Sequence, residues 1–82
     1  MKVNVLFFGA TADAVGEREV ELEFVENLTA EEIFDKIRDE FPALQKNFNQ
    51  NLLFAVNQEY AKGDEIIQND DELAVFTAVS GG

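Results

Sequence analysis

Residues 17–41 read EREVELEFVENLTAEEIFDKIRDEF, and within them the apolar spacing changes from every second residue to every third or fourth. In the first part, residues 17–25, Val20, Leu22 and Phe24 alternate with glutamates. Successive side chains of a strand point to opposite faces. The alternation therefore predicts a half-buried antiparallel strand with an acidic, solvated face.

A helix is predicted directly after this strand. Thr29 and Glu32 fit a capping box, so we expect the helix to begin at Ala30. Pro42 cannot continue a helix and marks its end. Apolar residues recur at helical spacing and form one stripe: Ala30, Ile33, Phe34, Ile37 and Phe41.

Further strands are predicted on both sides of this strand–helix unit. They are rich in β-formers or bounded by turn residues, and they lie at 2–8, 52–56, 60–62 and 72–79. We expect one helical turn within residues 10–15. Residues 43–51 are polar and rich in Asn and Gln, and they are expected to form a connection anchored by Leu44 and Phe48.

The predicted order is strand, strand, helix and then two or three strands. One helix packed across one face of a mixed sheet buries both the helical stripe and the alternating strand faces. We therefore predict an α+β fold of the β-grasp (ubiquitin-like) type, with four to five strands and one main helix on one face. The connection rules also allow a ferredoxin-like fold. That fold needs a second helix, and no second stretch of this sequence has the apolar stripe of such a helix. The whole chain, residues 1–82, is predicted to be one domain, with residues 80–82 as a flexible functional tail.

Composition narrows the classes of function. The 82 residues include 17 acidic and 6 basic side chains, a formal net charge of −11. A polyanion such as nucleic acid or an anionic membrane surface would be repelled, whereas a partner with a basic docking surface would be attracted. The same acidity also keeps a small protein in solution. No signal peptide is recognised at the N-terminus, and we expect a cytoplasmic protein.

Side chains suited to catalysis are scarce. The chain has no histidine and no cysteine, so it lacks the usual general base, a thiol nucleophile and a thiolate metal site. The densest acidic clusters, at 64–65 and 70–72, lack the spacing of a calcium loop, and we expect no metal site. We therefore expect no autonomous enzymatic activity.

The C-terminus carries the one group with an evident chemical use. Gly81 and Gly82 follow almost directly on the last predicted strand, and Val79 to Gly82 can extend about 13 Å. Without side chains, such a tail can enter a narrow tunnel in a partner. Its terminal carboxylate, with a pKa near 3.5, is ionised at neutral pH. That carboxylate can attack the α-phosphate of ATP if a partner supplies the nucleotide and cations. The alternative is an incidental frayed end.

A cluster of apolar side chains is predicted on the sheet face away from the helix. If alternate residues of the first and last strands face the helix, then Leu6, Phe8 and Phe76 fall on the opposite face, and Tyr60 can join them. Exposed aromatic residues gathered near the tail indicate a protein-binding surface. The alternative is that neighbouring connections cover them.

The sequence resembles a known family. Its motifs run in order through most of the chain: VLFFG at 5–9, VG at 15–16, AVNQ at 55–58, DELAVF at 71–76 and VSGG at 79–82. With these motifs it resembles the small, sulfur-carrying subunit of molybdopterin synthase, the MoaD type of β-grasp protein. The Gly-Gly end is shared with all ubiquitin-like carriers, whereas the first and third motifs favour this branch.

The resemblance implies a sulfur-transfer cycle. A ubiquitin-activating-type adenylyltransferase would use ATP and magnesium to convert the Gly82 carboxylate into an acyl-adenylate, and a sulfur donor would convert that into a thiocarboxylate. The carrier would then insert Gly81 and Gly82 into the large synthase subunit and donate sulfur to a cyclic pyranopterin precursor. No cofactor would stay bound to the carrier. The residues expected to bind the partner are Phe8, Tyr60, Phe76, Val79 and Ser80.

Other functions remain open at this point. A carrier for thiamine or another sulfur-containing product would use the same terminal chemistry. A ubiquitin-like modifier would join Gly82 to lysines of other proteins after the same activation step. A plain interaction domain would use only the apolar surface.

Overall fold

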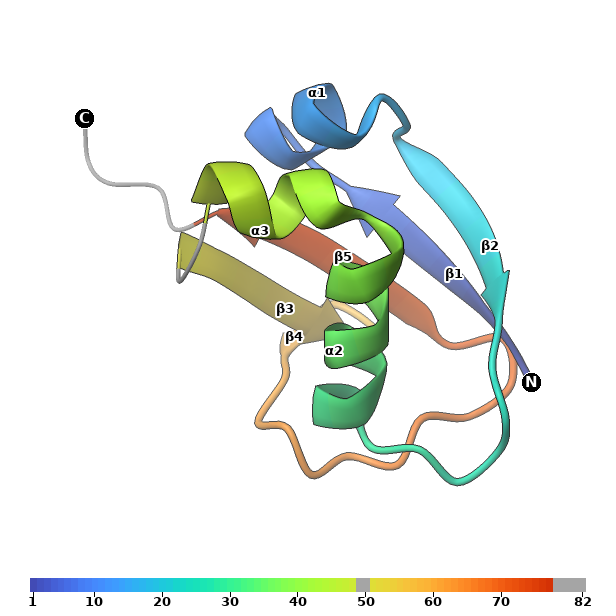
Figure 1. Cartoon of the computed structure of the whole chain (residues 1–82). Coiled ribbons are helices and arrows are strands. Elements are labelled where there is room, and N and C mark those ends of the chain that lie inside the picture. Colours follow the sequence, from blue (N-terminus) through green and yellow to red (C-terminus); the bar gives the residue numbers. More distant parts are fainter. Residues whose placement is uncertain (49–50, 78–82) are drawn as a thin grey trace.

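The structure is a computed structural model that describes residues 1–48 and 51–77 (Figure 1). Within these residues, eight helices and strands follow one another: β1 (Lys2–Phe7), α1 (Ala10–Val15), β2 (Glu19–Glu23), α2 (Ala30–Glu40), α3 (Pro42–Phe48), β3 (Leu52–Val56), β4 (Glu59–Tyr60) and β5 (Glu72–Thr77). Five of them are the predicted strands, and their ends differ from the predicted ones by at most two residues. Residues 78 and 79, predicted to extend the last strand, lie outside the described residues.

The strands form one mixed sheet in the order β2-β1-β5-β3-β4. β1 and β5 run parallel at its centre, and the other neighbouring pairs are antiparallel. Figure 1 shows the helices gathered on one side of this sheet, with α2 crossing the strands. The predicted α+β arrangement, a mixed sheet with one main helix on one face, is confirmed.

Alternation along the strands places the core between sheet and helices. In β1, Val3, Val5 and Phe7 are at most 2% exposed, whereas the residues between them are half-buried. In β5, Leu73 and Val75 are fully buried and lie beside β1 in the parallel register. The stripe of α2 covers this face through Ala30, Ile33 and Ile37, and Leu44, Leu52, Phe54 and Ile67 complete the core.

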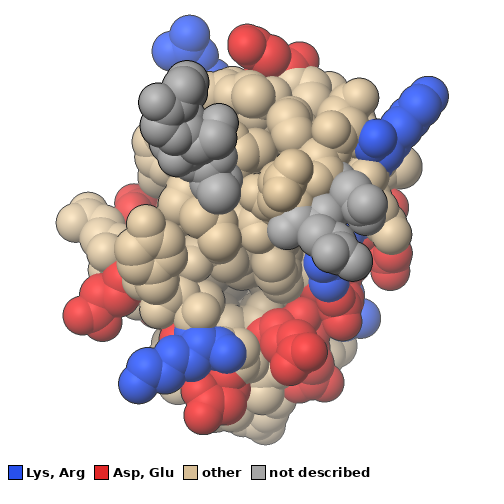
Figure 2. Space-filling model, turned by 90° about the vertical axis from the view of Figure 1, so that its left-hand side faces the viewer, with Lys and Arg blue, Asp and Glu red and all other residues tan. Residues whose placement is uncertain are grey.

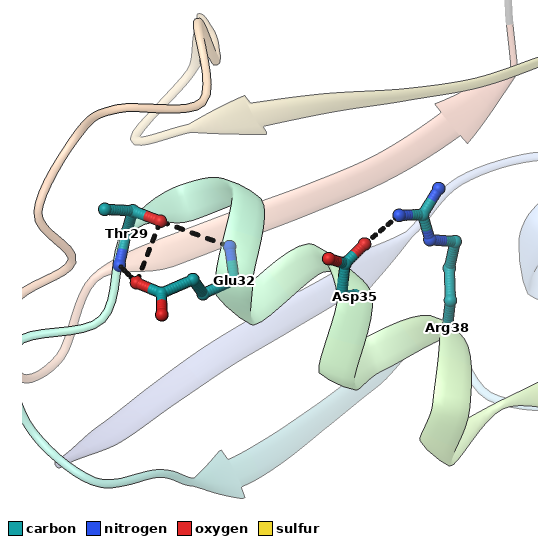
Figure 3. A network of polar contacts seen from close by, with 4 residues as sticks. All are labelled: Thr29, Glu32, Asp35 and Arg38. Carbon is teal, nitrogen blue, oxygen red and sulfur yellow. Dashed lines mark hydrogen bonds and ion pairs between the residues drawn. The ribbon is translucent and has the colours of Figure 1, made fainter.

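The predicted capping box begins α2 (Figure 3). The Thr29 hydroxyl accepts a hydrogen bond from the Glu32 backbone N–H at 3.2 Å, and the Thr29 N–H donates to the Glu32 carboxylate at 3.0 Å. One turn further on, the Arg38 guanidinium pairs with the Asp35 carboxylate. The backbone N–H groups of residues 30 and 31 have no partner within the helix, and they donate to the carbonyls of Glu65 and Gly63. The helix is thus tied to the loop that precedes β5.

One helix was missed from the sequence. Residues 43–51 were expected to be a connection, but Pro42–Phe48 form α3. Pro42 ends α2 and also suits a first helical position, where its missing N–H is not needed. The predicted anchors are correct: Leu44 is fully buried, and Phe48 packs against the core. α3 contacts α1 and α2, so it belongs to the helical layer.

No helix within residues 1–48 and 51–77 is long and apolar enough to cross a membrane.

Candidate functional site

A shallow apolar depression lies on the sheet face opposite the helices. It has a volume of about 540 Å³. Its lining comes from four strands, β1, β3, β4 and β5, and from the segments that follow β1 and β3: Leu6, Phe8, Ala55, Gln58, Tyr60, Glu72, Ala74 and Phe76. The strand register explains its shape, because the small side chains of Ala55 and Ala74 are paired across β3 and β5 at its centre. Larger side chains stand around them. We call this surface the outer-face depression.

Three predicted partner-binding residues meet in the outer-face depression. Phe8 is 51% exposed and Tyr60 is 72% exposed, whereas Phe76 is half-buried. The rings of Tyr60 and Phe76 are 5.8 Å apart between centroids and tilted by 55°. The structure therefore brings these residues together on one face, as the alternation of the strands predicted. Their part in binding a partner stays a prediction.

The alternative was that residues 9–16 or 43–50 cover this surface. Among the described residues they do not, because Phe8 and Tyr60 stay exposed and α1 and α3 belong to the helical layer with α2 (Figure 1). Residues 49 and 50 lie outside the described residues. Figure 2 turns the left-hand side of Figure 1 toward the viewer. On that side of the molecule, uncharged residues occupy the middle and upper part of the surface, and charged side chains lie in its lower part and at its margins. The outer-face depression itself is lined mainly by apolar side chains, which is the make-up of a protein-binding patch.

A buried threonine, which the sequence analysis did not single out, fixes the position of Phe8. Thr11 in α1 is 0% exposed, and its hydroxyl lies 2.7 Å from the Phe8 carbonyl oxygen and 2.9 Å from the Val75 carbonyl oxygen. The Phe8 N–H donates to the Thr11 hydroxyl at 3.0 Å and to the Val75 oxygen at 3.1 Å. Thr11 thus ties the end of β1 to β5. A threonine shortly after Gly9 was the available signal, since Ser and Thr hydroxyls often bond nearby backbone in turns.

Four predicted site residues belong to the C-terminal segment. Val79, Ser80, Gly81 and Gly82 lie outside the described residues, so their predicted roles as partner-binding tail and sulfur-bearing terminus stay predictions. The described part of β5 ends at Thr77, the residue after Phe76. The outer-face depression is therefore next in sequence to the tail.

The described part of the chain offers little for acid–base or metal chemistry. No group of three acidic side chains in residues 1–48 and 51–77 is placed to hold a metal ion. Glu65 shows the one resolved pKa shift there: backbone N–H groups, that of Lys62 first and then those of Glu65 and Gly63, lower the pKa of its carboxyl below 4.5. Glu65 braces the loop under α2 and does not line the outer-face depression.

Comparison with known proteins places this chain in a family. The model of the ThiS family matches residues 5–82. The chain belongs to the ThiS family. A relative of this ThiS-family chain, the molybdopterin synthase sulfur carrier subunit of Caenorhabditis elegans, is 40% identical to it over 84 residues, which cover 100% of this chain and 99% of the relative. The predicted resemblance to sulfur-carrying synthase subunits is confirmed.

Solved structures agree with the fold of the ThiS-family chain. SAMP1 (small archaeal modifier protein 1) from Haloferax volcanii superposes with a TM-score of 0.86 at 26% identity, covering 100% of both chains. A chain of the complex of subunits 1 and 2 of the molybdopterin-converting factor from Helicobacter pylori superposes with a TM-score of 0.71 at 22% identity, again over 100% of both chains. These likenesses confirm the β-grasp fold.

Proposed function

We propose that this protein is the sulfur carrier subunit of a molybdopterin synthase and that the carboxylate of Gly82 bears the sulfur. The observation that carries the proposal is the 40% identity, over the whole chain, to a protein of that name. The terminal Gly-Gly of the sequence supplies the matching chemical group. The relative's name also favours this function over the thiamine-type carrier.

The chemistry takes place at one carbon atom. A carboxylate oxygen of Gly82 attacks the α-phosphate of ATP, forming an acyl-adenylate and releasing pyrophosphate. A sulfur donor then displaces AMP and leaves a thiocarboxylate. After its sulfur has been transferred to a pyranopterin precursor, hydrolysis restores the carboxylate. A separate adenylyltransferase supplies ATP and magnesium, so this chain holds no permanent cofactor and performs no catalysis of its own.

The outer-face depression is the surface that binds the large synthase subunit. We assign Phe8, Tyr60 and Phe76 to the contact with the large synthase subunit, with Val79 and Ser80 continuing that contact toward the active site. The apolar, exposed character of this surface supports the assignment. The Helicobacter pylori relative of the same fold occurs in a two-subunit complex, which supports a partner of this kind.

Removing the last residue tests this function. We expect a chain without Gly82 to unfold at the same urea concentration as the full chain, because the core formed by the described residues lies between positions 3 and 75. Sulfur transfer to the precursor, measured with the activating enzyme, a sulfur donor and the large subunit, should disappear. A folded, shortened chain that still yields product at the normal rate would contradict the proposal.

A second candidate function is conjugation to other proteins. The likeness to SAMP1, a small archaeal modifier protein, favours it, because both roles begin with activation of a C-terminal glycine. Covalent conjugates that link Gly82 to lysine side chains, detected by mass spectrometry of digested cell extract, would support this function. Their absence, together with a thiocarboxylate end, would leave the sulfur carrier as the sole role.

A further inference from the structure

Strand β2 forms one edge of the sheet, and half of its backbone groups face away from β1. The hydrogen bonds at its two ends, from Phe24 N–H to the Met1 carbonyl and from Phe7 N–H to the Arg18 carbonyl, set the alternation. In an antiparallel pair, bonded positions occur at every second residue. Residues 18, 20, 22 and 24 therefore bond β1, and Glu19, Glu21 and Glu23 turn their N–H and C=O groups outward.

These outward backbone groups have no partner among the residues that the structure describes. None of Glu19, Glu21 and Glu23 donates or accepts any of the backbone hydrogen bonds found outside the strand pairs and helices. β2 pairs with β1 alone in the sheet order. A free row of alternating donors and acceptors is the template to which an extended peptide can add as a further strand.

The side chains along this edge differ on its two faces. On the outer face, Glu19, Glu21 and Glu23 are all exposed, and none of them forms an ion pair within residues 1–48 and 51–77. Along the same edge, a groove of about 380 Å³ lies between β2 and α2. Its lining combines apolar and charged side chains: Leu22, Glu23, Phe24, Lys36, Asp39 and Glu40.

We propose that the open edge of β2 binds an extended segment of a partner protein in which Lys or Arg alternates with apolar residues. Added to the sheet, such a segment pairs its backbone with Glu19, Glu21 and Glu23. Its side chains then alternate between the two faces. The basic ones lie beside the three glutamates, and the apolar ones enter the groove at Leu22 and Phe24. This surface shares no residue with the outer-face depression, although Glu19 is paired with Leu6 at its margin. Its occupation needs no C-terminal chemistry.

Charge complementarity selects this occupant over a second copy of the chain. Two β2 edges paired with each other would bring glutamate rows together, and like charges directly opposite are destabilising. The net charge of −11 acts in the same direction. A basic segment instead finds three carboxylates at the two-residue spacing of its own side chains.

The proposal is tested with a capped peptide of sequence KVKVKVK and the isotopically labelled full-length protein. In amide NMR spectra, the peptide should shift the signals of residues 19, 21 and 23 more than those of β4, the opposite edge. The same peptide with N-methyl groups on alternate residues keeps its charge but cannot pair as a strand, so it should cause no such shifts. Equal binding of the two peptides, or shifts confined to other residues, would overturn the proposal.

Two paired variants separate local charge from overall charge. Glu21→Gln with Glu23→Gln should weaken binding of KVKVKVK about fivefold, since it removes two cross-strand charge pairs. The matched control, Glu31→Gln with Asp64→Asn, removes two exposed carboxylates away from β2 and should leave the affinity within about twofold. Equal losses in both variants would mean that the peptide responds only to net charge, which would overturn the proposal.

Discussion

Thr11→Val tests whether one buried hydroxyl holds the end of β1 against β5. Valine has nearly the shape of threonine, so the main effect of the change is the loss of the hydrogen bonds of the hydroxyl. The affected groups each keep one backbone partner: Phe8 N–H still donates to the Val75 oxygen at 3.1 Å, and the Phe8 oxygen still accepts from residue 11 N–H at 3.1 Å. The cost should therefore fall in the lower part of the range of about 1–3 kcal/mol for a buried polar group that loses its partner.

We expect Thr11→Val to lower the free energy of unfolding by about 1.5 kcal/mol. With a urea dependence of about 1 kcal/mol per molar for a chain of this size, the midpoint of unfolding should fall by about 1.5 M. The matched control is Thr77→Val, because the half-buried Thr77 makes no side-chain hydrogen bond within the described residues. That variant should stay within about 0.5 kcal/mol of the native chain. A Thr11→Val chain as stable as the control would refute the role given to this hydroxyl.

Two further predictions concern the outer-face depression and Glu65, in the loop that precedes β5. Tyr60→Asp should weaken binding to the large synthase subunit by about 2 kcal/mol, roughly thirtyfold, because Tyr60 is expected to be a binding hot spot. The control, Val25→Asp, changes an exposed residue outside the outer-face depression and should leave the affinity unchanged. Calorimetry with the purified subunit measures both affinities, and equal values for the two variants would place the docking surface elsewhere. Because backbone N–H groups lower the pKa of Glu65, its stabilising contribution is present above the ordinary pKa of 4.5 and is lost as the pH falls through the lowered value. The Glu65→Gln variant should therefore have a lower free energy of unfolding than the native chain near neutral pH, and the two values should converge in acid. Urea unfolding at both pH values measures this. A difference in free energy that stays the same at both pH values would contradict the linkage.

The sequence predicted most of the fold because each main element carries its own local signal. The alternation of Val20 and Leu22 with glutamates gave β2, and the Thr29–Glu32 capping box fixed the start of α2. The helix α3 was missed because only Leu44 and Phe48 contact the core, and two apolar residues among polar ones do not make a recognisable stripe. Tertiary packing, rather than local propensity, stabilises that helix.

The candidate site was predicted in part for similar reasons. The period of two along β1 and β5 placed Leu6 and Phe76 on one face, and this placement follows from strand geometry alone. The contact of Phe76 with Tyr60 depends on the pairing of β3 with β4 and β5, which the sequence does not specify. For Thr11, only the local bond to Phe8 had a signal in the sequence. Its bond to Val75 could not be predicted, because the two residues are 64 positions apart in the chain.

The mass of the C-terminal peptide tests the central claim most directly. The protein is isolated from cells that contain the activating enzyme and a sulfur donor, digested, and measured by high-resolution mass spectrometry. A fraction of the peptide ending in Gly82 should be heavier than the plain acid by the difference between sulfur and oxygen, and it should return to the plain mass after turnover with the large subunit. A peptide that always has the mass of the plain acid, even with both partners present, would contradict the account.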